Sequence, residues 1–169
     1  IFDDAIHCAE TVRNDIPILS SSISISQLAV RTAEKVFENL EKCRVLLIGA
    51  GETAELTARY FRVAGVNKII IVNRSEKRGR YLAEAITADY FNIRDINDAL
   101  HECNVIVTAT HARDYLIERN QIEYIMNKRK EKLLLIDIST PRNIDLSIRH
   151  IENVCLYDLN QLDAISYQN

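Results

Sequence analysis

The chain alternates between short runs of apolar residues and longer segments in which apolar residues recur every three or four positions. Apolar runs without alternation indicate strands buried on both faces, and the periodic segments indicate helices with one buried side. The predicted strands span residues 44–48, 68–72, 89–92, 104–108, 133–137 and 154–157. The predicted helices that follow them span residues 52–64, 75–86, 93–101, 116–130 and 159–169.

This regular alternation of strand and helix predicts an α/β fold. A parallel sheet needs a crossover helix between consecutive strands, and these helices cover both of its faces. We therefore expect a doubly wound parallel sheet of the Rossmann type, with three α/β/α layers and the strand order 3-2-1-4-5-6.

The N-terminal part of the chain has a different pattern. Residues 1–13 are predicted to form a helix that ends before Pro17, because proline disfavours helix at the preceding residue. A serine-rich stretch, residues 20–26, follows, and Ser24 or Ser26 is expected to cap the next helix. The stretch is interpreted either as the boundary between an N-terminal remnant and the main domain or as a flexible surface loop.

Composition narrows the class of protein. A chain of 169 residues suits one domain, or one domain with a piece of another. The net charge of −3 argues against a domain that wraps nucleic acid by itself. No apolar run approaches the length of a bilayer span, and the first residues do not resemble a signal peptide. The chain lacks an initiator Met, so we expect a fragment of a longer cytoplasmic protein without membrane contact.

The cysteines and histidines show no metal-ligand spacing. Cys8, Cys43, Cys103 and Cys155 are scattered without a C-x-x-C pair, and the four histidines are equally dispersed. This pattern favours reduced, buried cysteines in a cytosolic protein and predicts no metal site.

The strongest motif lies where the first predicted strand meets its helix. Gly49, Gly51 and Ala54 form G-x-G-x-x-A, the dinucleotide fingerprint, in a strand–turn–helix setting. Gly49 would allow the tight turn, Gly51 would let a pyrophosphate approach the backbone, and Ala54 would let the helix pack closely on the sheet. The free N–H groups of the first helical turn would face the phosphates.

The end of the second strand indicates which dinucleotide is bound. NAD-binding sites carry Asp or Glu there for the ribose 2′-hydroxyl, whereas this chain has Asn73, Arg74 and Ser75, followed by Arg78. Arginine binds a 2′-phosphate with two hydrogen bonds, and a carboxylate would repel it. Two charge-assisted bonds of about 1.5 kcal/mol each would give a roughly 100-fold preference, so we predict NADPH as the cofactor.

Two further segments are predicted at the same edge of the sheet. Thr108, Ala109 and Thr110 end the fourth strand, and their small side chains would let the cofactor ribose and nicotinamide lie close to the backbone. Residues 137–143 follow the fifth strand and are expected to form a shaped loop near the nicotinamide, although Thr110 and Ser139 also fit simple turn chemistry. His111 is interpreted as a loop histidine rather than a general acid.

Several stretches together resemble one enzyme family. Gly-Ala-Gly-Glu-Thr-Ala at residues 49–54, Pro-Arg at 141–142 and Tyr-Asp at 157–158 are more specific than a general Rossmann match. The chain resembles the central NADPH-binding domain of glutamyl-tRNA reductase over nearly its whole length. The matching stretches are residues 22–26, 29–30, 45–54, 72–75, 137, 141–144, 153–154 and 156–159.

The resemblance implies a three-part architecture. Residues 1–22 would be a remnant of the N-terminal catalytic domain and linker, residues 23–158 the Rossmann domain, and residues 159–169 the start of a spinal helix that leads to a dimerisation domain. In the family, a catalytic-domain cysteine attacks the glutamyl ester of charged tRNA, and NADPH then delivers hydride to release glutamate-1-semialdehyde for tetrapyrrole synthesis. The implied partners are glutamyl-tRNA, bound through the missing catalytic domain, and a second subunit in a full-length homodimer.

The resemblance also assigns residues. The cofactor motif carries over onto Gly49, Ala50, Gly51, Glu52, Thr53, Ala54, Asn73, Arg74 and Ser75. No catalytic residue carries over, because none of the four cysteines matches the motif around the nucleophile, and the fragment alone is expected to be inactive. Residues 108–111 and 139–140 depart from the family pattern.

Two alternatives stay open. Shikimate dehydrogenases also carry Asn-Arg-Ser/Thr after the second strand, but their N-terminal substrate domain, with a catalytic lysine and aspartate, cannot be found in residues 1–40. The other alternative is a nucleotide-sensing module that binds NADPH and reduces nothing.

Overall fold

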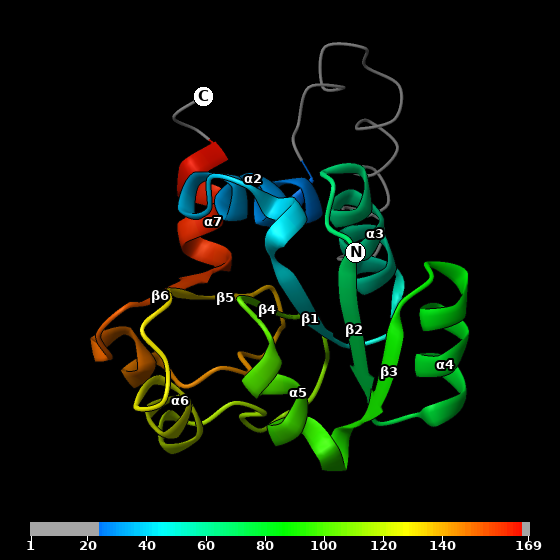
Figure 1. Ribbon diagram of the computed structural model, residues 1–169. Coiled ribbons are helices and arrows are strands. Elements are labelled where there is room, and N and C mark those ends of the chain that lie inside the picture. The colour runs from blue at the N-terminus through cyan, green and yellow to red at the C-terminus, as the bar shows by residue number, and fades with distance from the viewer. Residues whose placement is uncertain (1–23, 167–169) are drawn as a thin grey trace, which may run out of the picture.

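The structure of the protein is a computed structural model that describes residues 24–166, excluding the side chain of residue 166. Six strands form one sheet in the order β3-β2-β1-β4-β5-β6, and all neighbouring pairs are parallel, as predicted (Figure 1). The strands are β1 Arg44–Ile48, β2 Lys68–Asn73, β3 Asp89–Asn92, β4 Val105–Thr108, β5 Leu133–Asp137 and β6 Val154–Asp158.

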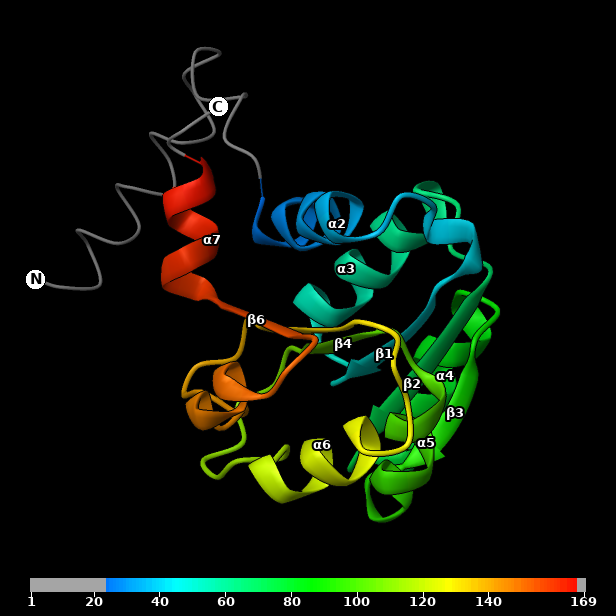
Figure 2. The ribbon, with the colours of Figure 1, turned by 60° about the vertical axis from the view of Figure 1, so that its left-hand side comes forward.

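Helices cover both faces of this sheet. The α-helices are α2 Ile25–Val36, α3 Glu52–Val63, α4 Glu76–Ala85, α5 Ile96–Glu102, α6 Arg119–Met126 and α7 Leu159–Ser166. Residues 24–166 also contain the short 3-10 turns η2 Leu40–Lys42, η3 Ile93–Asp95 and η4 Leu146–His150. Helices α2, α3, α4 and α7 pack into one apolar cluster, while α5, α6 and η4 pack into another. Figure 2 shows α7 beside α2.

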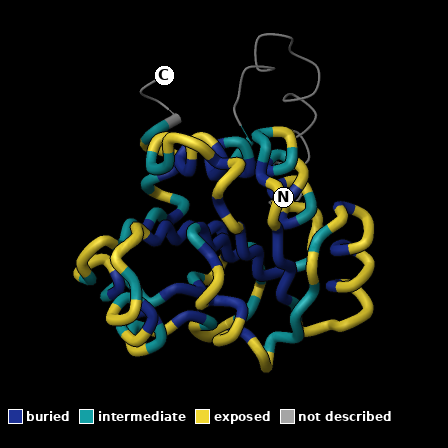
Figure 3. Tube along the Cα trace, viewed as in Figure 1, coloured by how far each residue is buried: buried dark blue, intermediate teal, exposed yellow. Residues whose placement is uncertain are grey.

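The central strands β1, β2, β4 and β5 are largely apolar because each contributes side chains to both clusters, whereas the edge strand β3 is only partly buried. In β1, Val45 and Leu47 belong to the cluster under α2 and α3, whereas Leu46 and Ile48 belong to the cluster under α5 and α6. Successive strand residues point to opposite faces, so a run without polar residues buries both. Figure 3 shows this continuous buried centre. No helix among the described residues is long and apolar enough to cross a bilayer.

The structure shows which of the two candidate serines caps α2. Ser24 accepts a hydrogen bond from the Gln27 N–H, and the Gln27 side chain accepts one from the Ser24 N–H, so Ser24 is the cap. Ser26 is buried instead and receives a hydrogen bond from the Thr57 hydroxyl at 2.9 Å. The predicted helix over residues 1–13 and the boundary near residue 22 lie outside the described residues.

The predicted helix over residues 116–130 is wrong in its length, because α6 covers only Arg119–Met126. The N–H groups of Leu116 and Ile117 both donate to the Asn143 carbonyl, and Ile117 forms a parallel bridge with Ile144. These contacts hold residues 116–117 extended, so the helix begins only after Glu118. The predicted helix over residues 93–101 begins as the η3 turn and becomes α-helical at Ile96.

Candidate functional site

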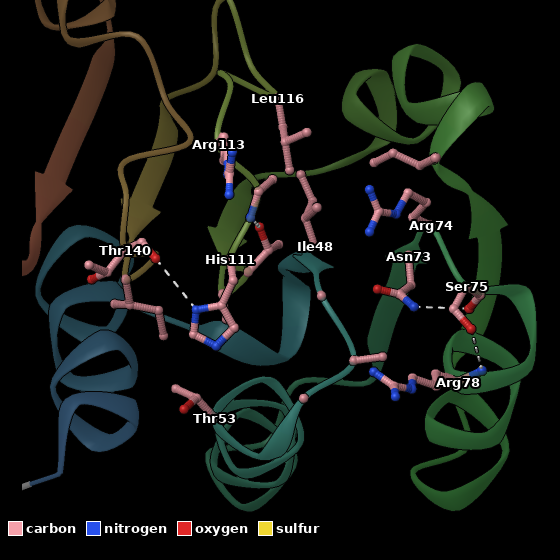
Figure 4. Close-up of a pocket in the computed structure, with 18 of the residues that line it drawn as sticks. Ile48, Thr53, Asn73, Arg74, Ser75, Arg78, His111, Arg113, Leu116 and Thr140 are labelled. Carbon is pink, nitrogen blue, oxygen red and sulfur yellow. Dashed lines mark hydrogen bonds between the residues drawn. The ribbon is translucent and has the colours of Figure 1, made fainter.

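A cavity of about 880 Å³ lies at the carboxyl ends of β1, β2 and β4 (Figure 4). This is the edge where the strand order reverses from β1 toward β2 and toward β4, the position at which open α/β sheets bind ligands. Most of the predicted cofactor residues line it, namely Gly49, Ala50, Gly51, Glu52, Thr53, Asn73, Arg74, Ser75, Arg78, Ala109 and Thr110.

The two predicted residues that do not line the cavity are buried behind it. Ala54 has no exposed surface and joins the cluster under α3, where its small side chain lets the helix approach the sheet. Thr108 is also fully buried, and its hydroxyl donates to Asp137 at 2.8 Å. A direct cofactor contact through either side chain is therefore not supported, and both act on the site through packing.

Gly49 directly follows β1 and has a backbone conformation that favours glycine. Its φ is +127°, and a Cβ there would lie 2.3 Å from the Ala109 carbonyl oxygen. Its N–H donates to the Val72 carbonyl at 2.9 Å, while the Ala109 N–H donates to the Ile48 carbonyl at 2.9 Å. The absence of a side chain thus lets the ends of β2, β1 and β4 meet.

Gly51 has the opposite surroundings. It is extended, with φ −92° and ψ −177°, and a Cβ built on it would meet no atom within 4 Å. It caps α3 without any side-chain hydrogen bond, and the first N–H groups of a helix have no intrahelical partner. The open space and free donors fit an anionic group, since the helix dipole also favours negative charge there.

A basic corner lies where β2 leads into α4. Arg74 and Arg78 line the cavity, and neither guanidinium forms an ion pair or hydrogen bond within the described part of the chain. Ser75 caps α4 by accepting from the Arg78 N–H at 3.4 Å, and the Asn73 amide donates to the Ser75 carbonyl at 2.9 Å. Figure 4 shows these four side chains together on one side of the cavity.

Other contacts hold this corner in place. Gly79 lets α4 approach β3, because a Cβ there would lie 2.3 Å from a ring carbon of Tyr90. The Tyr90 hydroxyl donates to the Asn73 carbonyl at 3.3 Å. Unlike Arg74 and Arg78, Arg80 has partners within the protein, because it pairs with Glu76 at 2.8 Å and stacks over the Tyr90 ring.

At the opposite end of the cavity, a buried carboxylate holds the loop after β5 in place. Asp137 is 2% exposed and accepts four hydrogen bonds, from the Thr108 hydroxyl and from the N–H groups of Ser139, Asn143 and Ile144. A buried carboxylate is tolerated where such donors satisfy it. Asp137 therefore has a turn role and fixes the loop after β5.

Asn143 links that loop to the one after β4. It is fully buried, and its side-chain oxygen accepts from the Thr110 hydroxyl at 2.6 Å. Its amide nitrogen donates to the carbonyls of Ala112 and Asp114, at 2.8 and 3.1 Å. The Thr110 N–H in turn donates to the Ser139 hydroxyl at 3.0 Å, so both residues have turn roles, and Thr110 also lines the cavity.

Sequence reasoning missed several residues that line the cavity. Ile93, Arg113, Asp114 and Leu116 come from turns after β3 and β4. Their isolated positions give no motif, although Arg113 is a charged residue shortly after a predicted strand end. His111 also lines the cavity, with its Nδ1 3.4 Å from the Thr140 carbonyl, and among the described residues no carboxylate orients its ring.

Asp158 is the last residue of β6 and contacts Arg142, which lies in the loop after β5. It is 7% exposed, caps α7 through the Gln161 N–H, and receives hydrogen bonds from Arg142 at 3.2 Å and Arg149 at 2.7 Å. Burial alone would raise the pKa of its carboxyl, but the Gln161 N–H and the two guanidinium groups outweigh this and lower it. Asp158 is therefore the helix cap of α7.

Two of the cysteines that the structure describes, Cys43 and Cys103, are buried and poorly suited to act as nucleophiles. Burial raises the pKa of Cys103 to about 12, and burial also raises the pKa of Cys43. Cys155 is partly buried in β6. Within the described ranges, no group of three or more His, Cys, Asp or Glu residues could hold a metal ion.

A family model described as "Shikimate / quinate 5-dehydrogenase" matches residues 31–165, most of the chain. The chain belongs to the shikimate / quinate 5-dehydrogenase family. The match covers β1 through most of α7, and therefore all the elements around the cavity.

Within this family, the chain is homologous to glutamyl-tRNA reductases. It is 37% identical to that of Geobacter metallireducens and 36% identical to that of Geobacter sulfurreducens, each over 98% of this chain. The chain spans 38% of the length of these curated relatives. The resemblance inferred from the residues is confirmed.

Solved structures agree with this relationship. Glutamyl-tRNA reductase from Methanopyrus kandleri matches with a TM-score of 0.80 and 28% identity, over 99% of this chain and 42% of that one. The nucleotide binding domain of glutamyl-tRNA reductase from Thermoplasma volcanium matches with a TM-score of 0.67 and 26% identity, over 87% and 94%. Quinate dehydrogenase from Corynebacterium glutamicum in complex with NAD shares the fold, with a TM-score of 0.63 at 15% identity. The fold is thus a nucleotide-binding dehydrogenase fold.

Proposed function

We propose that this chain is the NADPH-binding domain of a glutamyl-tRNA reductase, an oxidoreductase of tetrapyrrole and heme biosynthesis. The observation that carries the cofactor choice is the basic corner of Arg74, Ser75 and Arg78, which stands at the end of β2 in place of a carboxylate. Both guanidinium groups are unpaired within residues 24–166, so they keep their hydrogen-bonding capacity for a 2′-phosphate.

The chain's own residues would bind and orient the dinucleotide. The first turn of α3 and the open face of Gly51 would receive the diphosphate, and the basic corner would hold the adenosine end. Ala109, Thr110 and the loop built on Asp137 would receive the nicotinamide end. When bound, NADPH supplies the hydride that reduces the glutamyl group to glutamate-1-semialdehyde.

The remaining parts of the enzyme would lie in neighbouring segments. Residues 1–22 are proposed to belong to the catalytic domain and linker, residues 23–158 to the Rossmann domain and residues 159–169 to the spinal helix; the last proposal fits the start of α7 at Leu159. Glutamyl-tRNA would be bound through the catalytic domain, and the full-length cytoplasmic protein would be a homodimer. This chain alone would bind NADPH without turnover.

The direct test is a titration of the chain with NADPH and with NADH, in which binding is monitored by the fluorescence of the reduced nicotinamide. The wild type should prefer NADPH by roughly 100-fold, and Arg74→Ala should weaken NADPH binding by about 10-fold or more while leaving NADH nearly unchanged. Equal loss for both nucleotides, or a wild-type preference for NADH, contradicts the assignment. Adding the catalytic domain should restore turnover of glutamyl-tRNA.

A second candidate is a shikimate- or quinate-type dehydrogenase, which the description of the matching family model favours. Such an enzyme needs residues that act on the hydroxyl of its substrate, and turnover of shikimate by this chain would support it. A nucleotide-sensing module is distinguished by NADPH binding that no added catalytic domain converts into turnover.

A further inference from the structure

Arg113 is a third arginine at the cavity, and neither a motif nor a family resemblance assigns it a role. It is exposed, lines the cavity, and forms no ion pair within residues 24–166, even with the adjacent Asp114. Figure 4 shows its side chain directed into the cavity, on the side opposite Thr53 of α3. By contrast, Arg80, which is outside the cavity lining, is paired with Glu76.

The backbone that carries Arg113 is held from within the protein. The Asn143 amide nitrogen donates to the carbonyls of Ala112 and Asp114, the residues on either side of Arg113. Asn143 is fully buried, and its own N–H donates to the Asp137 carboxylate at 2.8 Å. An arginine on such a fixed loop loses less conformational entropy when it binds a ligand, because its main chain is already ordered.

The charges around the cavity leave one part of a dinucleotide without a cation. Arg74 and Arg78 lie at the adenosine corner, whereas the first turn of α3 offers N–H groups and the acidic side chain of Glu52. A diphosphate seated on that turn would face a carboxylate and no basic side chain from the same turn. Arg113 comes from the facing wall and would supply the missing positive charge.

We propose that Arg113 binds the diphosphate of the dinucleotide from the side opposite α3. The proposal rests on the proposed nucleotide-binding function. Since NADPH and NADH share the diphosphate and differ in the 2′-phosphate, a diphosphate contact affects both nucleotides equally. Arg74 is expected to affect NADPH selectively, so the two arginines have distinguishable signatures.

The test compares Arg113→Gln with the wild type and with Arg94→Gln in the 169-residue chain. Arg94 is also exposed and has no side-chain partner within residues 24–166, but it does not line the cavity, which makes it a matched control. Dissociation constants for NADPH and NADH are measured at low and high salt. Arg113→Gln should weaken both by about tenfold, or about 1.4 kcal/mol, and should reduce the salt dependence of binding. Arg94→Gln should change neither, and Arg113→Lys should recover part of the affinity.

Each other outcome has a definite meaning. If the wild type binds neither nucleotide, the proposed function fails and the role of Arg113 with it. If the wild type binds both and Arg113→Gln binds equally well, the proposed function stands and the Arg113 contact is refuted. A loss confined to NADPH would instead place Arg113 at the 2′-phosphate and overturn the diphosphate contact. A loss with no recovery in Arg113→Lys and a lowered melting temperature would indicate a structural role and also refute the contact.

Discussion

The two glycines of the fingerprint are expected to respond in opposite ways to the same added methyl group. Gly51→Ala places a methyl group in open space, since no atom lies within 4 Å of the position that its Cβ would take, and its backbone is accessible to any residue. Gly49→Ala places the same group 2.3 Å from the Ala109 carbonyl oxygen at a φ of +127°. The pair therefore separates a requirement of the ligand from a requirement of the fold.

For Gly51→Ala, two effects on stability nearly cancel. Reduced freedom of the unfolded chain contributes about 0.4–1 kcal/mol, and alanine is a poorer helix cap than glycine by about 0.5 kcal/mol. The melting temperature should therefore move by about 2 °C or less. NADPH binding should weaken, because the methyl group occupies the space where a phosphate would contact the α3 N–H groups. Losing one charge-assisted bond of about 1.5–3 kcal/mol weakens binding roughly 10- to 150-fold.

For Gly49→Ala, the costs add. The left-handed backbone costs about 1–3 kcal/mol, and the overlap with Ala109 costs about 1–3 kcal/mol more. Their sum of about 2–6 kcal/mol corresponds to a melting temperature lower by at least about 4 °C and by about 6–12 °C for a loss of about 3 kcal/mol. Thermal melts and NADPH titrations of both variants test the reasoning. It is refuted if Gly51→Ala destabilises the fold as much as Gly49→Ala, or if it binds NADPH as tightly as the wild type.

Three further predictions concern residues that support the site. Asp137→Asn should lower the free energy of unfolding by about 2–4 kcal/mol, because an amide replaces a carboxylate that accepts four hydrogen bonds. Urea denaturation measures this loss, and a loss below about 0.5 kcal/mol contradicts the role of the buried network. The folded-state pKa of Asp158 is depressed below 3.8, so its contribution to stability is fully present above the unfolded pKa and is lost as pH falls through the folded pKa. The stability difference between wild type and Asp158→Asn should thus be constant from pH 7 to about pH 5 and shrink below about pH 4, whereas a difference that grows on acidification contradicts the sign. Cys43 and Cys103 should resist alkylation in the native protein at about pH 8, because burial raises both pKa values, and rapid modification detected by mass spectrometry would contradict their burial.

The sequence by itself determined the sheet and the centre of the candidate site. Apolar runs such as residues 45–48 predict strands buried on both faces, and both faces are indeed covered by helices. The strand order followed from right-handed crossover connections, which leave few topologies for this alternation. The glycine turn and the basic residues after β2 were found because each lies within a few positions of a strand end, so local order along the chain already brings them to one edge.

Only the tertiary structure decided how the loops at that edge are built. The chain at residues 116–117 has a helical pattern, yet hydrogen bonds to the distant Asn143 hold it extended. The same Asn143 fixes the two carbonyls beside Arg113, and Asp137 fixes Asn143. The contacts of Asn143 with residues 112–117 join parts of the chain that are many positions apart, and they satisfy polar groups that burial would otherwise leave unpaired. No local pattern encodes them, because their partners are set by which strands become neighbours in the folded sheet.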